Sequence, residues 1–411
     1  MRHLEGNAVI GQSGGPTAAI NASLAGVVSK LLGFDFVKKV YGMRHGVEGL
    51  LKEDLIDLSE VFGKDGEEKL GLLSHTPAAA LGSCRKKLPK PDDDPVFYEN
   101  LIYIFKKYDI RYFFYIGGND SMDTVAKLTE YTENNDYDIR VIGVPKTIDN
   151  DLCSTDHTPG FGSAAKYIAT TVQEIIRDCA VYTVPAVTIV EIMGRDAGWL
   201  TASSALPRAV TGYGPDLIYL PERAFSLEAF LEDVKAALEV HPNVVIAVSE
   251  GLRDSDGVYV GEKSQSGVAD VFGHKYLSGT GKALELFVKA KLGCKVRSVE
   301  LNISQRCAAH SASAVDIAES FGVGSAAAQS AADGLTGCMM AIERTDEKDY
   351  SVVYVPKSIS GIANAVRTVP DRFINAEGNN VTDECVDYLL PLIKGEVPLK
   401  YRDGLPEIFV F

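Results

Sequence analysis

Two short clusters of glycine, acidic and basic residues could together bind a phosphate group and move a proton. The first spans residues 117–121, Gly-Gly-Asn-Asp-Ser, and the second spans 146–151, Lys-Thr-Ile-Asp-Asn-Asp. Glycine amides can approach a phosphate closely, a lysine can neutralise it, and carboxylates can bind Mg²⁺ or accept a proton from a hydroxyl. For either cluster alone, an ordinary turn from a strand into a helix remains the alternative.

A third glycine turn lies near the N-terminus, where Ser13-Gly14-Gly15 follows a predicted strand at residues 7–12. A helix predicted from about Thr17 to Leu32 would point its N-terminal amides at this turn, an arrangement that binds phosphate. The turn has neither the Gly-x-Gly-x-x-Gly pattern of dinucleotide-binding proteins nor the P-loop pattern. Three cations at 85–87 follow Gly82-Ser83, so a phosphate-facing loop and a solvated charged face are equally open interpretations.

Apolar runs and amphipathic segments alternate along the chain and predict an α/β protein with mostly parallel sheets and helices on both faces. Ser121 is predicted to cap a helix through Thr132. Further predicted strands are 112–116, 141–144, 186–193, 217–220, 244–248, 296–301 and 352–355, and further predicted helices are 163–179, 227–240, 282–292 and 311–321.

Ligands of parallel α/β sheets bind beyond the carboxyl ends of the strands. The three glycine-rich or charged turns, together with Gly194-Arg195 and Glu250, all follow predicted strands, so we expect them to share one crevice. Asp120, Asp149 and Asp151 could supply oxygen ligands to Mg²⁺. Arg195, Arg297 and Arg306 could bind a sugar phosphate through bidentate contacts, although each alone is more typical of surface charge or a structural ion pair.

Composition restricts the class of protein. The 411 residues exceed the size at which a single core usually stops growing, so two or more lobes are expected. The net charge of −15 argues against nucleic acid or an anionic membrane as partner. Seven scattered cysteines without a Cys-x-x-Cys pair, and an N-terminus without a long apolar region, predict a cytoplasmic protein.

The motifs at 13–15, 117–121, 145–151, 193–195, 250 and 305–306 occur in the order found in the phosphofructokinase family, which this chain resembles over residues 8–310. The resemblance implies two Rossmann-like lobes with the active site in the cleft between them. It implies that Asp149 is the base for the C1 hydroxyl of fructose 6-phosphate. The sugar-phosphate site would comprise Thr147, Ile148, Asp149, Met193, Gly194, Arg195, Glu250, Arg297 and Arg306.

The same resemblance bears on the phosphoryl donor. ATP-dependent members carry glycine at the position of Asp120, and a carboxylate there would occupy the space of the α-phosphate and repel its charge. Asp120 with Lys146 is the pattern of the diphosphate-dependent branch, with diphosphate contacts implied at Gly14, Gly15, Gly118, Arg85 and Lys86. Asn119 replaces the usual metal-binding aspartate, so Mg²⁺ is expected on Asn119, Asp120 and Asp151.

We therefore predict a Mg²⁺-dependent enzyme that acts on diphosphate and fructose 6-phosphate and forms a homodimer or homotetramer. An ATP-dependent enzyme and a non-catalytic regulatory subunit of the same fold are the alternatives. Residues 1–180 would form a larger lobe with the donor site, and residues 181–345 a smaller lobe with the sugar-phosphate site. Residues 346–411 would pack back on both lobes.

Overall fold

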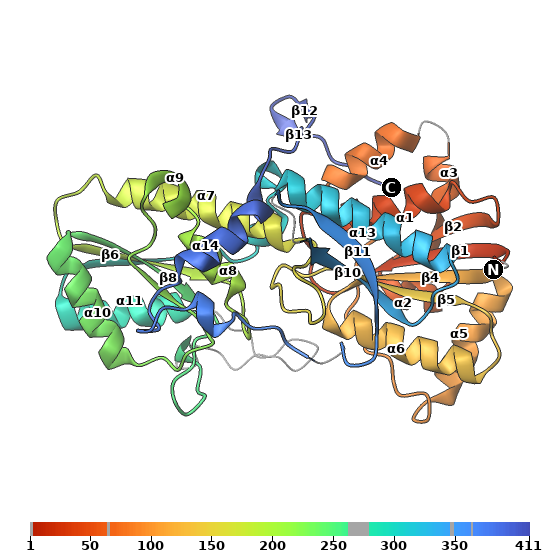
Figure 1. Ribbon diagram of the computed structural model, residues 1–411, viewed down its shortest axis with the longest axis horizontal. Coiled ribbons are helices and arrows are strands. Elements are labelled where there is room, and N and C mark those ends of the chain that lie inside the picture. Colours follow the sequence, from red (N-terminus) through yellow and green to blue (C-terminus); the bar gives the residue numbers. More distant parts are fainter. Residues whose placement is uncertain (1–2, 64–65, 262–278, 346–348, 363–364) are drawn as a thin grey trace.

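The larger lobe is built around a seven-stranded sheet, in which five neighbouring strands are parallel and the strand at each edge is antiparallel (Figure 1). The computed structural model describes residues 3–63, 66–261, 279–345, 349–362 and 365–411. In spatial order the strands are β11 (Val352–Ser358), β10 (Cys338–Arg344), β5 (Arg140–Pro145), β4 (Ile110–Gly117), β1 (Gly6–Gln12), β2 (Val37–Met43) and β3 (Leu55–Asp57).

Helices cover both faces of this sheet, which is why its central strands β1, β4 and β5 are buried along nearly their whole length. In β4, Tyr112 and Phe114 pack towards one face, whereas Phe113 and Tyr115 pack towards the other. The first face is covered by α1 (Ile20–Leu31), α3 (Leu58–Phe62), α4 (Gly66–His75) and α13 (Ala314–Ala332). The second is covered by α2 (Gly46–Leu51), α5 (Pro95–Lys107) and α6 (Asn119–Asn134).

The smaller lobe has a four-stranded sheet in which all strands are parallel. Its strands, in spatial order, are β7 (Leu217–Tyr219), β8 (Asn243–Ser249), β6 (Ala186–Ile192) and β9 (Lys295–Glu300). One face packs on α10 (Leu227–Val240) and α11 (Thr280–Leu292), and the other on α7 (Phe161–Cys179) and α8 (Trp199–Ala202). The predicted α/β class, with mostly parallel sheets in two lobes, is confirmed.

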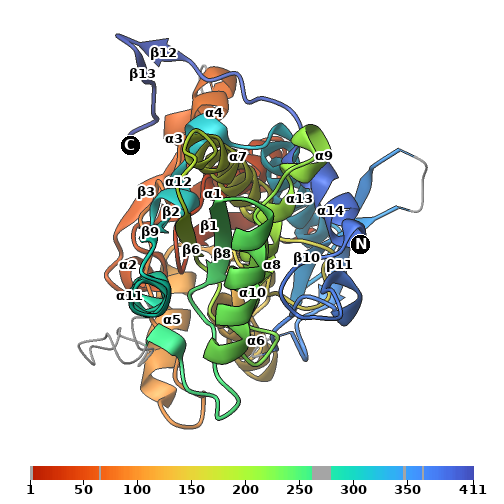
Figure 2. The same cartoon turned by 90° about the vertical axis from the view of Figure 1, so that its left-hand side faces the viewer.

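The C-terminal part of the chain touches both lobes (Figure 2). The helix α14 (Asp383–Leu389) joins the core of the smaller lobe. Phe409 stacks on Phe62 of the larger lobe, and Phe411 packs edge-on against the same ring. Between them lies a hairpin of β12 (Tyr401–Arg402) and β13 (Leu405–Pro406). The remaining short helices are α9 (Arg208–Thr211), α12 (Ser304–Cys307) and the 3₁₀ turns at 203–205, 309–311, 371–373 and 390–393.

Three local predictions were wrong. The helix expected from Thr17 begins at Ile20, because the Thr17 hydroxyl accepts hydrogen bonds from the amides of Ala19 and Ile20 ahead of the helix. The helix predicted at 311–321 begins at Ala314 and continues without a break to Ala332, as α13. β10 was not predicted, and although it falls within 181–345 it pairs with β5 in the larger sheet.

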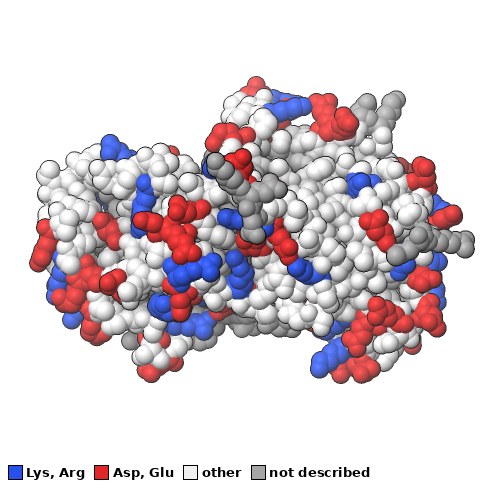
Figure 3. Space-filling view, viewed as in Figure 1, with Lys and Arg blue, Asp and Glu red and all other residues white. Residues whose placement is uncertain are grey.

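Acidic and basic side chains are interspersed over the face shown in Figure 3, without one large patch of either sign. Among the described residues no helix is both long and apolar enough to cross a membrane. All seven cysteines are free thiols.

Candidate active site

A cavity of about 490 Å³ lies where strand ends of the two lobes face each other. It is lined from the larger lobe by the turns that follow β1, β4 and β5, and from the smaller lobe by the turns that follow β6 and β8. The predicted site residues that line it are Gly14, Gly15, Arg85, Lys86, Gly118, Asn119, Asp120, Lys146, Thr147, Ile148, Asp149, Asp151, Met193, Arg195, Glu250 and Arg306.

Two predicted residues stand outside this lining. Gly194 lies directly behind it and donates its amide to Glu250 Oε1 at 3.4 Å. Arg297 lies on β9, half-exposed, with its Nη1 at 3.7 Å from Asp178 Oδ2, and it borders a different, smaller cavity. The structure therefore does not bring Arg297 together with the other arginines within one chain.

The lining also contains residues that the sequence did not single out. Most of them are neighbours of predicted residues in the same turns, so the rule of strand ends could have included them. Val366 has no such signal, because it reaches the cavity from a C-terminal segment remote in sequence. The additional residues are Ser13, Pro16, Thr17, Cys84, Lys87, Ser121, Asp196, Ala197 and Val366.

The helix α6 begins three residues earlier than predicted, at Asn119, with Gly118 at its N-cap in place of Ser121. Ser121 therefore does not cap the helix. A Cβ on Gly117 would lie 1.9 Å from the Ser121 hydroxyl, so the position requires glycine for the helix to start this close to the strand. The first-turn amides and the positive end of the helix dipole consequently face the cavity at Asn119 and Asp120.

The side chain of Lys146 lines the cavity and is only 3 % exposed. Its ammonium group donates a hydrogen bond of 2.6 Å to the carbonyl oxygen of Gly15. Burial lowers its pKa to about 8, against the opposing effect of the Asp149 and Asp151 carboxylates. A Cβ on Gly14, which has φ +78°, would lie 3.2 Å from this nitrogen, so glycine here leaves room for the lysine.

The loop after β5 presents Asp149 and Asp151 on either side of Asn150, whose backbone is left-handed at φ 54°. The Asp149 amide donates to Thr147 Oγ1 at 3.1 Å, which tightens the turn. Burial, and then the neighbouring Asp151 carboxylate, raise the pKa of Asp149 to about 7, while Lys146 and nearby arginines oppose the rise. A carboxylate with a pKa near neutrality is suited to act as a general base.

The smaller lobe contributes the groups that face Asp149. Burial, together with the charge of Asp149, raises the pKa of Glu250 to about 8. A Cβ on Gly251 would lie 1.9 Å from the Arg195 carbonyl oxygen, so the turns after β6 and β8 are in close backbone contact. Arg306, beside Gly15, has its Nε buried without a hydrogen-bond partner, as expected of a cation that awaits an anionic group.

Asn119 and Asp120 differ in their surroundings although they are adjacent. Asn119 donates to Asp151 Oδ2 at 3.4 Å, and its own Oδ1 is buried without a hydrogen-bond partner. Asp120 instead forms an ion pair of 3.1 Å with Lys87 and is 43 % exposed. Among the residues that the structure describes, no group of three His, Cys, Asp or Glu side chains could hold a metal ion by itself.

This arrangement combines a buried lysine, two partly buried arginines, a helix N-terminus and an unusually basic carboxylate around one cavity. Cations and amides stabilise the charge of a transferring phosphoryl group, and the carboxylate can accept the proton of an attacking hydroxyl. The geometry therefore suits phosphoryl transfer to an alcohol.

Comparison with known proteins agrees with this chemistry. Residues 7–330 match the family model described as Phosphofructokinase. A protein of Halomonas elongata, named pyrophosphate–fructose 6-phosphate 1-phosphotransferase, is 40% identical over 98% of this chain and 95% of its own length. A sulfofructose kinase of Alkalicoccus urumqiensis is 34% identical over 89% of this chain and 91% of its own. A solved pyrophosphate-dependent phosphofructokinase of Nitrosospira multiformis superposes with a TM-score of 0.88 at 37% identity, covering 98% and 95% of the two chains.

Proposed function

Since the chain belongs to the phosphofructokinase family, we propose that it transfers a phosphoryl group from diphosphate to the C1 hydroxyl of fructose 6-phosphate. The products are fructose 1,6-bisphosphate and phosphate. The observation that carries the proposal is that Lys146, Asp120 and Asp149 line one cavity, so that a donor cation, a carboxylate that disfavours nucleotide and a base lie together.

The donor is assigned from Asp120. Its carboxylate lies in the first turn of α6, at the edge of the cavity where a longer polyphosphate would extend. A negative side chain there repels an α-phosphate, whereas diphosphate ends before reaching it. Lys146, Gly14, Gly15 and Gly118 then bind the diphosphate, with Arg85 and Lys86 at its outer side.

The acceptor is placed on the side of the smaller lobe. Arg195 and Arg306 bind the 6-phosphate, and Glu250 with the Met193–Gly194 turn binds the sugar. Asp149 takes the proton from the C1 hydroxyl as that oxygen attacks the terminal phosphorus of diphosphate, and phosphate leaves. Because diphosphate and the sugar bisphosphate are close in phosphoryl-transfer potential, we expect the reaction to be reversible.

Mg²⁺ fits the site on the side of Asp151. The Asn119 Oδ1 is buried without a hydrogen-bond partner, and the amide nitrogen of the same side chain donates to the Asp151 carboxylate. Mg²⁺ usually takes one or two protein oxygens together with substrate phosphate. When bound, the ion would neutralise the charge of the diphosphate. Asp120 is the weakest candidate among the three predicted Mg²⁺ ligands, because its carboxylate already forms an ion pair with Lys87.

A coupled aldolase assay tests the donor, with diphosphate and ATP as rivals at saturating Mg²⁺. We expect turnover with diphosphate and little with ATP. Strong activity with ATP and none with diphosphate would overturn the donor assignment. Absence of activity with both, in protein that still binds fructose 6-phosphate, would favour the regulatory-subunit alternative.

Assembly and location form part of the proposal. A homodimer or homotetramer would allow Arg297, which borders a separate surface cavity, to face a neighbouring copy. The scattered free cysteines support a reducing compartment such as the cytoplasm. Sedimentation of the purified protein measures the assembly directly.

A further inference from the structure

A residue of the C-terminal segment lies behind the loop that carries Asp149 and Asp151. Arg367 donates its backbone amide to the carbonyl oxygen of Asp151 at 2.8 Å, and its Nη1 to the carbonyl oxygen of Asn150 at 3.4 Å. One residue, more than two hundred positions downstream, therefore holds two successive carbonyls of the loop. Its neighbour Val366 lines the cavity itself.

The held loop contains a left-handed residue. Asn150 has φ 54°, a conformation that asparagine adopts more readily than most residues but that still costs up to about 1 kcal/mol. Surrounding contacts help to maintain such a conformation. The two hydrogen bonds from Arg367 act on the carbonyls at and after this residue, so they help to fix the directions of the carboxylates on either side.

The same guanidinium is anchored to the smaller lobe. Its central carbon lies 4.3 Å from the ring centroid of Trp199, and the Trp199 indole N–H donates to the Arg367 carbonyl oxygen at 3.1 Å. Trp199 begins α8, four residues after Arg195 of the sugar-phosphate side. Arg367 thus joins the loop of the base to the segment that carries the expected sugar-phosphate contacts.

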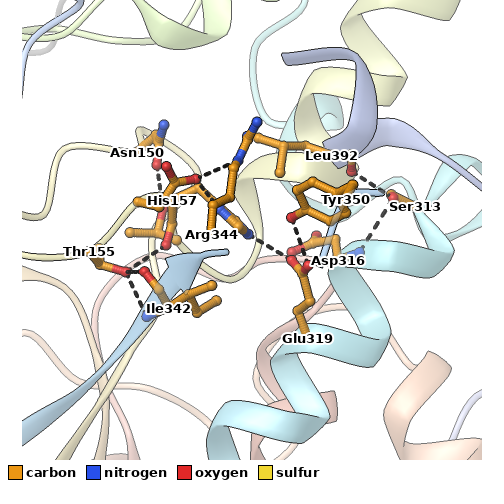
Figure 4. A network of polar contacts seen from close by, with 12 residues as sticks. Asn150, Thr155, His157, Ser313, Asp316, Glu319, Ile342, Arg344, Tyr350 and Leu392 are labelled. Carbon is orange, nitrogen blue, oxygen red and sulfur yellow. Dashed lines mark hydrogen bonds and ion pairs between the residues drawn. The ribbon is translucent and has the colours of Figure 1, made fainter. Parts of the chain in front are cut away.

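A third contact ties Arg367 to a buried polar network. Its Nη2 donates to the Tyr388 hydroxyl at 3.0 Å, and that hydroxyl donates to the Asp156 carbonyl oxygen at 2.8 Å. Asp156 also binds His157 and Arg344, which are both labelled in the polar network of Figure 4. The guanidinium is therefore fixed on three sides before any ligand arrives.

We propose that Arg367 is a positioning residue, which holds the Asp149–Asp151 loop against the Trp199 segment so that base and metal-side carboxylate face the sugar and the diphosphate together. The proposal rests on the proposed function. Arg367 touches no reacting atom in this role. It acts through the backbone of Asn150 and Asp151 and through the ring of Trp199.

Three variants separate positioning from general stabilisation. Arg367→Gln removes the guanidinium contacts with Asn150, Tyr388 and the Trp199 ring but leaves the main-chain bonds to Asp151 and the Trp199 indole, so it tests the side chain's part in positioning. Arg367→Lys keeps only the charge, and Arg372→Gln is the matched control. Arg372 lies in the same segment and makes an ion pair of 2.9 Å with Glu384 and a ring contact with Phe373, both away from the loop. We expect Arg367→Gln to lower kcat about 10- to 100-fold, as small displacements of reacting groups do, with a smaller change in KM for fructose 6-phosphate.

The Mg²⁺ concentration for half-maximal activity provides a readout that loss of folded protein would not move. It should rise in Arg367→Gln, rise less in Arg367→Lys and stay unchanged in Arg372→Gln, with the melting temperature of each variant measured alongside. An unchanged kcat and Mg²⁺ requirement in folded Arg367→Gln would overturn the proposal. Equal losses in Arg372→Gln would overturn it as well.

Fluorescence gives a second readout that needs no turnover, because Trp199 is the only tryptophan of the chain. Adding diphosphate with Mg²⁺ should change its emission in the wild type, and the change should be lost in Arg367→Gln. If the wild type responds without turning over diphosphate, the proposed reaction fails while the coupling stands. A full emission response in Arg367→Gln would show that the loop and Trp199 are coupled without Arg367, and would overturn the inference.

Discussion

Asp149 is placed so that its surroundings, and not its intrinsic acidity, make it a base. Burial raises its pKa to about 7, while Lys146, Arg195 and Arg306 keep the ionised form accessible. The groups expected to bind the 6-phosphate and the sugar ring, Arg195, Arg306 and Glu250, lie on other turns of the cavity. Proton removal and substrate binding can therefore be altered independently.

Asp149→Ala should reduce turnover about 10²- to 10⁴-fold, the usual contribution of a general base, with little change in affinity for fructose 6-phosphate. Steady-state kinetics with diphosphate, together with calorimetric titration of the sugar phosphate, measures both effects. Asp92→Ala, at an exposed position, is the control. Near-normal turnover in Asp149→Ala would remove this residue as the base.

Asp120 should control the choice of donor by its charge and its volume, which two substitutions separate. Asp120→Gly removes both, and Asp120→Asn removes the charge alone. We expect the ratio of kcat/KM for ATP to that for diphosphate to rise at least about tenfold in Asp120→Gly. A tenfold change corresponds to about 1.4 kcal/mol, which is less than the repulsion energy of two close charges near a protein surface. A smaller rise of this ratio in Asp120→Asn would show that the remaining part of the effect comes from the volume of the side chain. An unchanged ratio in both variants would contradict the role of Asp120.

At the scale of elements, the contact between α1 and α13 depends on two reciprocal glycines. A Cβ on Gly26 would lie 2.0 Å from the Phe321 carbonyl oxygen, and a Cβ on Gly324 would lie 2.2 Å from the Ser23 carbonyl oxygen. The two helices therefore meet backbone to backbone. This contact holds α13 against the sheet next to β10, which follows it in the chain.

Gly324→Ala should lower the free energy of unfolding by about 1–3 kcal/mol or more, because the helices must separate to admit the methyl group. Gly71→Ala is the matched control, since Gly71 is exposed on α4 with no atom within 4 Å of the added Cβ. Alanine there should be neutral or stabilise the helix by up to ~1 kcal/mol. Denaturant unfolding measures the free energy of unfolding of both variants. Equal changes in the two variants would refute the explanation by close helix packing.

How far the sequence predicts these elements depends on whether their signal is local. The turns after β4 and β5 could be placed, because apolar runs end abruptly and parallel strands bring their carboxyl ends together. The start of α6 was misplaced by three residues, because Gly118 takes the N-cap position in place of Ser121. β10 was missed, and Val366 and Arg367 carry no local sign that they reach the loop of Asp149.

At the scale of the whole molecule, distant segments meet in a buried polar network around His157 (Figure 4). His157 bridges Asp156 at 2.8 Å and Glu319 of α13 at 2.6 Å, and Tyr350 donates to the other oxygen of Glu319. Burial alone would lower the pKa of His157, but the hydrogen bonds and charges of Asp156 and Glu319 raise it to about 9. The imidazolium is therefore the form built into the fold.

Because the folded pKa of His157 lies above the unfolded value of about 6.5, the stability it contributes is complete below pH ~6.5 and is lost as pH rises through about 9. Unfolding free energies at pH 6, 7.5 and 9.5 should therefore fall across this window. In His157→Gln the fall should be smaller, and the protein should be less stable at pH 6. If the unfolding free energy of His157→Gln falls with pH as steeply as that of the wild type, the pH dependence comes from other titratable groups.

The return of the chain to the larger sheet has a consequence for synthesis on the ribosome. β5 ends at Pro145, and β10, which pairs with it, begins only at Cys338, after all four strands of the smaller sheet have been made. Until then the outer edge of β5 has no neighbour and is open to pairing with another nascent chain. The smaller sheet can form first, and the larger one is completed last.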